Sequence, residues 1–112
     1  ERAETALRAL RPQDPRARVT VEGGWLRPPM ARDERTAALL GAAQGIAAEL
    51  GFELPEMTAG GGSDGNTTHR FTPTLDGLGA VGDGAHAEHE HVRIPEMARR
   101  AALLAGLLLG PA

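Results

Sequence analysis

Two glycine-rich runs between residues 58 and 92 constrain the fold of this chain more than any other feature. The first reads TAGGGSDGN and the second reads GLGAVGDGAH, in a chain with 15 glycines among 112 residues. Glycine loses more conformational entropy on folding than other residues, and it lets a ligand approach the backbone closely. The pattern predicts two loops at strand ends, which meet around a site with exposed backbone N–H groups and one imidazole, that of His86.

The composition predicts one small domain with a thin core. The apolar residues are mostly Ala and Leu, and the only aromatic residues are Trp25, Phe52 and Phe71. A chain of this size buries about two thirds of the surface that its unfolded form exposes. We therefore expect little apolar burial to offset the entropy that the glycines lose.

The charge and the missing residue types exclude several kinds of partner. The formal net charge is −3, all 12 positive residues are arginines, and there is no cysteine. Nucleic acids and membrane surfaces are usually met by a basic patch, so neither partner is expected. The longest apolar run, residues 101–109, is shorter than the ~20 residues that span a bilayer. The charged start shows no secretory signal, so we expect a cytoplasmic piece of a larger soluble protein.

The first part of the chain predicts a helix, a strand and a hinge. Apolar residues at helical spacing predict a helix over residues 1–10, and strict alternation predicts a half-buried strand over residues 16–22. The sequence GGWLRPP then interrupts all periodicity, which indicates a domain boundary. Trp25 is predicted to be a buried anchor there.

The rest of the chain alternates helices with short strands, as in an α/β layer. A helix is predicted over residues 34–50, with Asp33 as N-cap and Gly51 as the C-terminal glycine. Further strands are predicted over residues 52–58, with the strand proper at 56–59, at residues 74–76, near Val81 and at residues 92–94. A short helix capped by Ser63 or Asp64 would reach about residue 70. The last helix would start at Pro95 and stop at residues 110–111.

Three stretches are candidates for a site, and each keeps a simpler alternative. Glycines leading into Ser63 and a helix N-terminus suit a carboxylate, a phosphate or an oxyanion, but they also suit a flexible turn. The run GDGAHAEHEH offers imidazoles and carboxylates for zinc, with one histidine as ligand, or else a solvated loop. Arg27, held between Trp25 and two prolines, could clamp a carboxylate, or could stack on Trp25 at the surface.

As an ensemble, WLRPPM, TAGGGSDGN and GAVGDGAHAEHEHV resemble the C-terminal part of zinc-dependent carboxypeptidases and deacylases. These form the family of glutamate carboxypeptidase, acetylornithine deacetylase and succinyl-diaminopimelate desuccinylase. The resemblance covers nearly the whole chain and implies an α/β fold. Residues 1–26 would be the last helix and strand of an α+β lid, or dimerisation, domain. Residues 27–112 would be part of a three-layer αβα zinc-peptidase catalytic domain, in a parent that forms homodimers.

The resemblance also implies roles for individual residues. His86 would ligate one of two zinc ions, Arg27 would bind the substrate carboxylate, and Gly61, Gly62 and Ser63 would line the substrate pocket. The supporting residues would be Asp64, Asn66 and Glu90. The reaction would hydrolyse the amide bond of an N-acyl amino acid or a peptide with a free C-terminal carboxylate, most like glutamate carboxypeptidase.

The general base and the other zinc ligands of the family lie in an N-terminal half that these residues do not include. No catalytic residue is therefore assigned here, and the 112 residues alone are expected to be inactive. Two other interpretations stay open. One is a stand-alone module that binds a metal or an anion, and the other is a truncated relative with a structural role.

Overall fold

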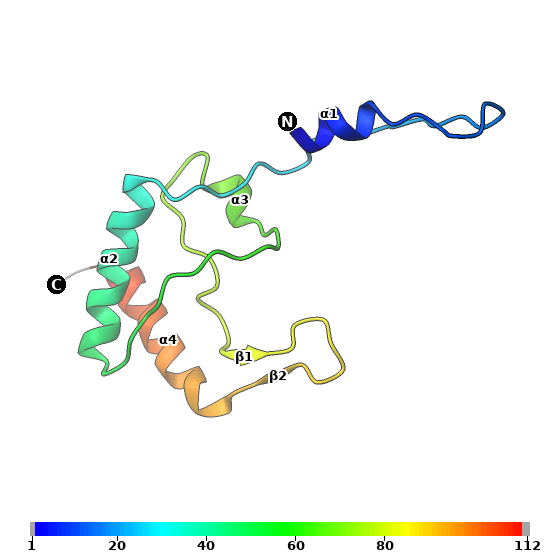
Figure 1. Cartoon of the computed structure of the whole chain (residues 1–112). Coiled ribbons are helices and arrows are strands. Elements are labelled where there is room, and N and C mark those ends of the chain that lie inside the picture. Colours follow the sequence, from blue (N-terminus) through cyan, green and yellow to red (C-terminus); the bar gives the residue numbers. More distant parts are fainter. Residues whose placement is uncertain (1, 111–112) are drawn as a thin grey trace.

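The computed structural model describes residues 2–110, and most of its regular structure is helical (Figure 1). The helices are α1 (Arg2–Arg8), α2 (Glu34–Glu49), α3 (Gly65–Thr68) and α4 (Ile94–Leu109). The strands β1 (Gly82–Asp83) and β2 (His91–Val92) form an antiparallel pair, with Gly82 opposite Val92. Helices α2 and α4 pack against each other and form the centre of the fold.

Helix α2 begins at Glu34, as the sequence predicts, and ends at Glu49, one residue before the predicted end. The Asp33 side chain accepts a hydrogen bond from the Thr36 N–H at 2.8 Å, which satisfies one of the unpaired donors of the first turn. At the other end Gly51 has φ +80°. Around it the Gly51 N–H donates to the Ala48 carbonyl and the Phe52 N–H donates to the Ala47 carbonyl, both at 3.0 Å, the pattern of a Schellman motif.

The thin core predicted from the composition is confirmed. The buried apolar residues lie on α2, on α4 and in the segment after α2, and they are Leu40, Ala43, Ala47, Leu54 and Leu103. Among them Leu103 is the one large side chain that is fully buried. Helix α4 approaches α2 closely at Gly106, where an added Cβ would lie 2.8 Å from Ile46 Cγ2. The helix pair is therefore held by small residues and few large ones.

Three of the predicted strands are not strands in the structure. Residues 16–22, 52–58 and 74–76 are irregular, and β1 and β2 form the only sheet among the described residues. A strand needs a neighbour for its backbone hydrogen bonds, and these segments have none. Val19 is consequently 45% exposed despite its alternating pattern. The expected αβα layers, the lid domain and the boundary after residue 26 stay predictions.

The chain is elongated. Its radius of gyration is 19.9 Å and its extents are 66 × 36 × 17 Å, whereas a compact domain of this length has a radius of gyration of about 13 Å. Helix α1 and the long loop that follows it stand away from the α2–α4 pair (Figure 1). The predicted last helix ends at Leu109 with Gly110 as its C-cap, at φ +78°. Pro111, the second predicted stop, lies outside the described residues.

Candidate functional site

The structure brings the hinge and the glycine turn together, although they are far apart in the sequence. The Asn66 side-chain amide donates to the Pro28 carbonyl at 2.9 Å, across a sequence separation of 38 residues. An Arg27 guanidinium nitrogen, Nη2, lies 3.6 Å from Asp64 Oδ1. Arg27 therefore lies next to Asp64, which directly follows the turn that Gly61, Gly62 and Ser63 form.

The turn itself is held by short-range hydrogen bonds. Asn66 Oδ1 accepts from the Ser63 N–H at 2.8 Å, and Ser63 Oγ accepts from the Gly65 N–H at 3.0 Å. Asn66 thus bonds both to the turn and to the hinge. Asp64 is the N-cap residue of α3 but makes no capping hydrogen bond with its side chain, so Ser63 takes that role.

A third segment, around Asp76, closes this cluster. A Cβ added to Gly65 would lie 3.0 Å from Ser63 Oγ, 3.3 Å from Met30 Sδ and 3.5 Å from Asp76 Cβ. The pKa of the Asp76 carboxyl is held below its usual value, chiefly by the Ser63 hydroxyl and then by the Gly77 N–H. A larger residue at position 65 would therefore press on Ser63 and Met30, which would have to shift by a few tenths of an ångström.

Two backbone donors of the turn are available to a ligand. Within residues 2–110 neither the Gly61 nor the Gly62 N–H donates a hydrogen bond, and both residues are exposed. Helix α3 has only four residues, so its dipole adds little to anion binding, because the macrodipole is a sum over aligned peptide units. Any anion at this turn would depend on the two amides and on Arg27, whose side chain is 46% exposed.

The prediction that the two glycine-rich loops meet around one site is wrong for this structure, because His86 lies in a separate loop between β1 and β2. Its backbone has φ +67°, an uncommon value for a residue with a Cβ. The Glu90 carboxylate accepts a hydrogen bond from the His86 N–H at 3.3 Å. A Cβ on Gly84 would lie 2.6 Å from His89 Cδ2, so the loop folds tightly on itself. In Figure 1 this loop projects away from α3, and among the described residues no hydrogen bond or ion pair links the two.

The residues present do not fit a complete metal site. Among residues 2–110 no three histidine or acidic side chains lie close enough together to hold a metal ion. His86, His89 and His91 are all exposed, and the His91 ring nitrogen Nδ1 lies 3.0 Å from the carbonyl of His89. A metal ion bound at His86 would therefore need further ligands from outside the described residues.

His69 is a residue that the sequence analysis does not single out. Its side chain is only 12% exposed, and its Nδ1 lies 3.2 Å from the hydroxyl of Thr36, which is buried. The sequence gives no local signal for this contact, since the two residues are 33 positions apart. Asp76 was likewise missed, although the glycine that follows it marks a turn.

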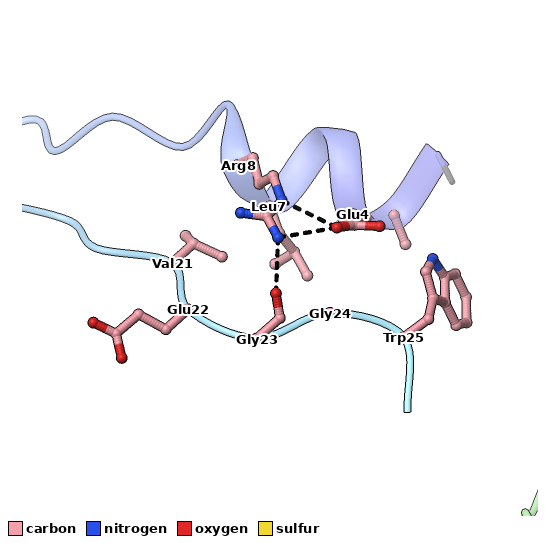
Figure 2. Close-up of a pocket in the computed structure, with 9 residues that line it drawn as sticks. Glu4, Leu7, Arg8, Val21, Glu22, Gly23, Gly24 and Trp25 are labelled. Atoms are coloured by element: carbon pink, nitrogen blue, oxygen red, sulfur yellow. Dashed lines mark hydrogen bonds and ion pairs between the residues drawn. The ribbon is translucent and has the colours of Figure 1, made fainter. Parts of the chain in front are cut away.

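The prediction that Trp25 is a buried anchor is wrong for this structure. Its side chain is 64% exposed and lines a cavity of about 280 Å³ between α1 and residues 21–25. Figure 2 shows that Arg8 bridges the two sides of this cavity, donating to Glu4 Oε1 and, at 2.7 Å, to the Gly23 carbonyl. Because Trp25 faces this cavity beside a single short helix, few atoms cover its ring.

Comparison with protein families assigns the chain to a class of enzymes. The model of peptidase family M20/M25/M40 matches residues 5–110. The match covers most of the chain, so the protein is part of the metallopeptidase class of hydrolases. The chain belongs to the M20/M25/M40 peptidase family. Neither the curated proteins nor the solved structures gave a match to it. No helix among residues 2–110 is both long enough and apolar enough to cross a membrane.

Proposed function

We propose that the chain is the C-terminal part of a zinc-dependent amidohydrolase. The enzyme would release an amino acid from an N-acyl amino acid, or from the end of a peptide, as a glutamate carboxypeptidase does. Family membership supports the hydrolase class. The observation that carries the substrate proposal is the contact of Arg27 with Asp64, in the segment that directly follows two glycines with unused backbone N–H groups.

Arg27 is suited to hold the free carboxylate of the substrate. A guanidinium presents two parallel N–H groups that match the two oxygens of a carboxylate. Its present partner, Asp64, is 3.6 Å away, and the Asp64 side chain is 97% exposed, so their ion pair is weak. A substrate carboxylate can therefore replace Asp64, while the amides of Gly61 and Gly62 bind other oxygens of the substrate.

The proposal assigns these residues a single metal ligand and no chemical step. We propose two zinc ions in the intact enzyme, with His86 as the one ligand that these residues supply. Since the described residues form no complete metal site, no chemical step is assigned to them, and their role is to bind and orient the substrate. We further propose that the intact enzyme is a cytoplasmic homodimer.

Carboxylate binding can be tested on the 112-residue chain by NMR titration with N-acetyl-L-glutamate. The amide signals of Gly61, Gly62 and Ser63 should move, and Arg27→Gln should abolish the movement. Arg32→Gln is the matched control, because Arg32 is an exposed arginine paired with Glu56 at 2.6 Å. The methyl diester of the ligand should cause no movement. Equal responses from the Arg27 and Arg32 variants would refute the assignment of Arg27.

The reaction is tested in the intact enzyme that contains these residues. Incubation with N-acyl glutamates should release free glutamate, and a chelator followed by zinc should remove and restore the activity. Arg27→Gln should raise KM more than it lowers kcat, because it removes a contact to a carboxylate whose charge does not change in the reaction. The 112 residues alone, with zinc added, should release nothing, and turnover by this chain would contradict the proposal.

A further inference from the structure

Helix α3 is fastened at both ends to the segment that contains the hinge and the start of α2. At its N-terminal end Asn66 donates to the Pro28 carbonyl. At its C-terminal end His69, the C-cap residue, contacts the first turn of α2. A helix of four residues has no stability of its own, because nucleation costs more than so few hydrogen bonds return. Its position must therefore come from contacts with other segments, and these two attachments are the ones that reach the hinge and the start of α2.

The C-terminal attachment consists of three contacts that converge on His69. Its Nδ1 lies 3.2 Å from Thr36 Oγ1, and its Nε2 lies 3.9 Å from Asp33 Oδ2. Arg35 Nη2 donates to the His69 carbonyl at 3.4 Å, and Arg35 Nε also bonds the Asp33 carboxylate at 3.0 Å. With only 12% of its side chain exposed, His69 is the most enclosed group in this attachment apart from Thr36.

This attachment bears directly on the candidate substrate site. Residues 61–63 lead into α3, whereas Arg27 precedes α2, so the distance between the glycine turn and Arg27 depends on how α3 sits against the start of α2. The apolar core cluster contains no residue of α3. Asn66 attaches one end. At the other end Thr68 Oγ1 accepts a hydrogen bond from Thr74 Oγ1 at 3.4 Å, and His69 makes the side-chain contact with the start of α2.

We propose that His69 is a positioning residue for the substrate carboxylate site: through Thr36 it holds α3 so that the Gly61–Ser63 turn faces Arg27. The inference rests on the proposed function of Arg27 and of the turn. His69 does not touch the substrate, and its effect is on the geometry of the groups that do.

The test compares variants of the 112-residue chain at the two ends of the His69–Thr36 contact. His69→Ala removes the ring, and Thr36→Val removes the hydroxyl while keeping the shape of the side chain. His69→Asn should keep the wild-type affinity for the ligand, because an asparagine side chain places a polar atom near the position of Nδ1. His91→Ala is the matched control, since His91 is an exposed histidine in β2, away from α3.

Two readouts are measured for each variant. The first is the amide exchange rate of Ser63, whose N–H bonds to Asn66. The second is the affinity for N-acetyl-L-glutamate by NMR titration. His69→Ala and Thr36→Val should each weaken binding by about threefold to tenfold, the effect of one ordinary hydrogen bond, and should speed Ser63 exchange. The double variant should be no worse than either single variant, because both remove the same contact.

The outcomes separate this inference from the proposed function. If wild type binds the ligand and His69→Ala binds it equally well, the inference is refuted and the proposed function stands. If wild type does not bind, the proposed function of Arg27 fails, and Ser63 exchange still decides whether His69 positions the turn. Loss of binding in His69→Ala that His69→Asn does not restore, or that His91→Ala reproduces, also refutes the inference. Unchanged NMR signals from α2 and α4 would show that each variant is folded. If His69→Ala does not fold, the inference is tested by Thr36→Val, which should weaken binding, and by His69→Asn, which should not.

Discussion

Replacing one helical glycine by alanine should have opposite effects at two positions of the helix pair. Gly45 lies in α2, and nothing within 4 Å would meet an added Cβ. Gly106 lies in α4, and there the added Cβ would lie 2.8 Å from Ile46 Cγ2. The chemical change is identical, so the difference between the two variants measures how closely α4 approaches α2.

The expected magnitudes follow from two opposing effects. Alanine stabilises a helix interior by about 0.8–1.0 kcal/mol relative to glycine, so Gly45→Ala should raise the free energy of unfolding by about 1 kcal/mol. At Gly106 the same gain is offset by overpacking, which costs about 1–3 kcal/mol. Gly106→Ala should therefore be about 1–3 kcal/mol less stable than Gly45→Ala. Ile46→Ala removes Cγ2, so adding Gly106→Ala to that variant should again be stabilising.

The assay is urea denaturation followed by far-UV circular dichroism, which reports mainly on α2 and α4 in this structure. The unfolding slopes should agree among variants, because each unfolds the same surface. If Gly106→Ala stabilises the chain as much as Gly45→Ala does, the helices do not meet at this position, and the packing described here is wrong.

Three further predictions concern the core, the first helix cap and association. Leu103→Ala should lower the free energy of unfolding by about 2–5 kcal/mol in urea denaturation, whereas Leu104→Ala, at a residue 39% exposed, should cost far less. The pKa of Asp33 is lowered from 3.8 to about 2, chiefly because the Thr36 N–H donates to its carboxylate. The stability from this cap is therefore complete above pH 4 and is lost as pH falls towards 2; urea midpoints should show this acid loss, and Asp33→Asn should flatten it. The unpaired segment 16–22 should make the chain associate at high concentration in light scattering, and Val19→Lys should reduce the association; a monomer at all concentrations would contradict this.

Local signals in the sequence predicted the helices well. The ends of α2 follow from Asp33 and Gly51, because a cap is formed by residues within a few positions of one another. Pro95 likewise lies in the first turn of α4, as predicted. The predictions of three strands were wrong because a strand depends on a partner that lies elsewhere in the sequence. Alternation in residues 16–22 describes one strand, but the partner that would make it part of a sheet is not specified by that pattern.

The candidate site also has features that the sequence predicts and features that it does not. That Arg27 and the glycine turn belong together followed from the resemblance to a family, and the order of the motifs carried it. The contacts that join them could not be inferred, because the Asn66–Pro28 bond spans 38 positions and the His69–Thr36 contact spans 33. Neither pair has a periodicity or a spacing that points to it. Trp25 was predicted to be buried because of its residue type, but few atoms of the structure pack around it.

The structure therefore separates what stabilises the chain from what shapes its site. The α2–α4 pair contributes most of the buried apolar residues, but the glycine turn, Arg27 and α3 are arranged by a few polar contacts. Each such contact is worth only about 0.5–1.5 kcal/mol, so the site can change geometry while the helix pair stays folded. In an intact enzyme of the proposed kind, this is the part of the chain that a bound substrate carboxylate would order most, because Arg27 and the turn gain a common ligand that replaces the weak pair with Asp64.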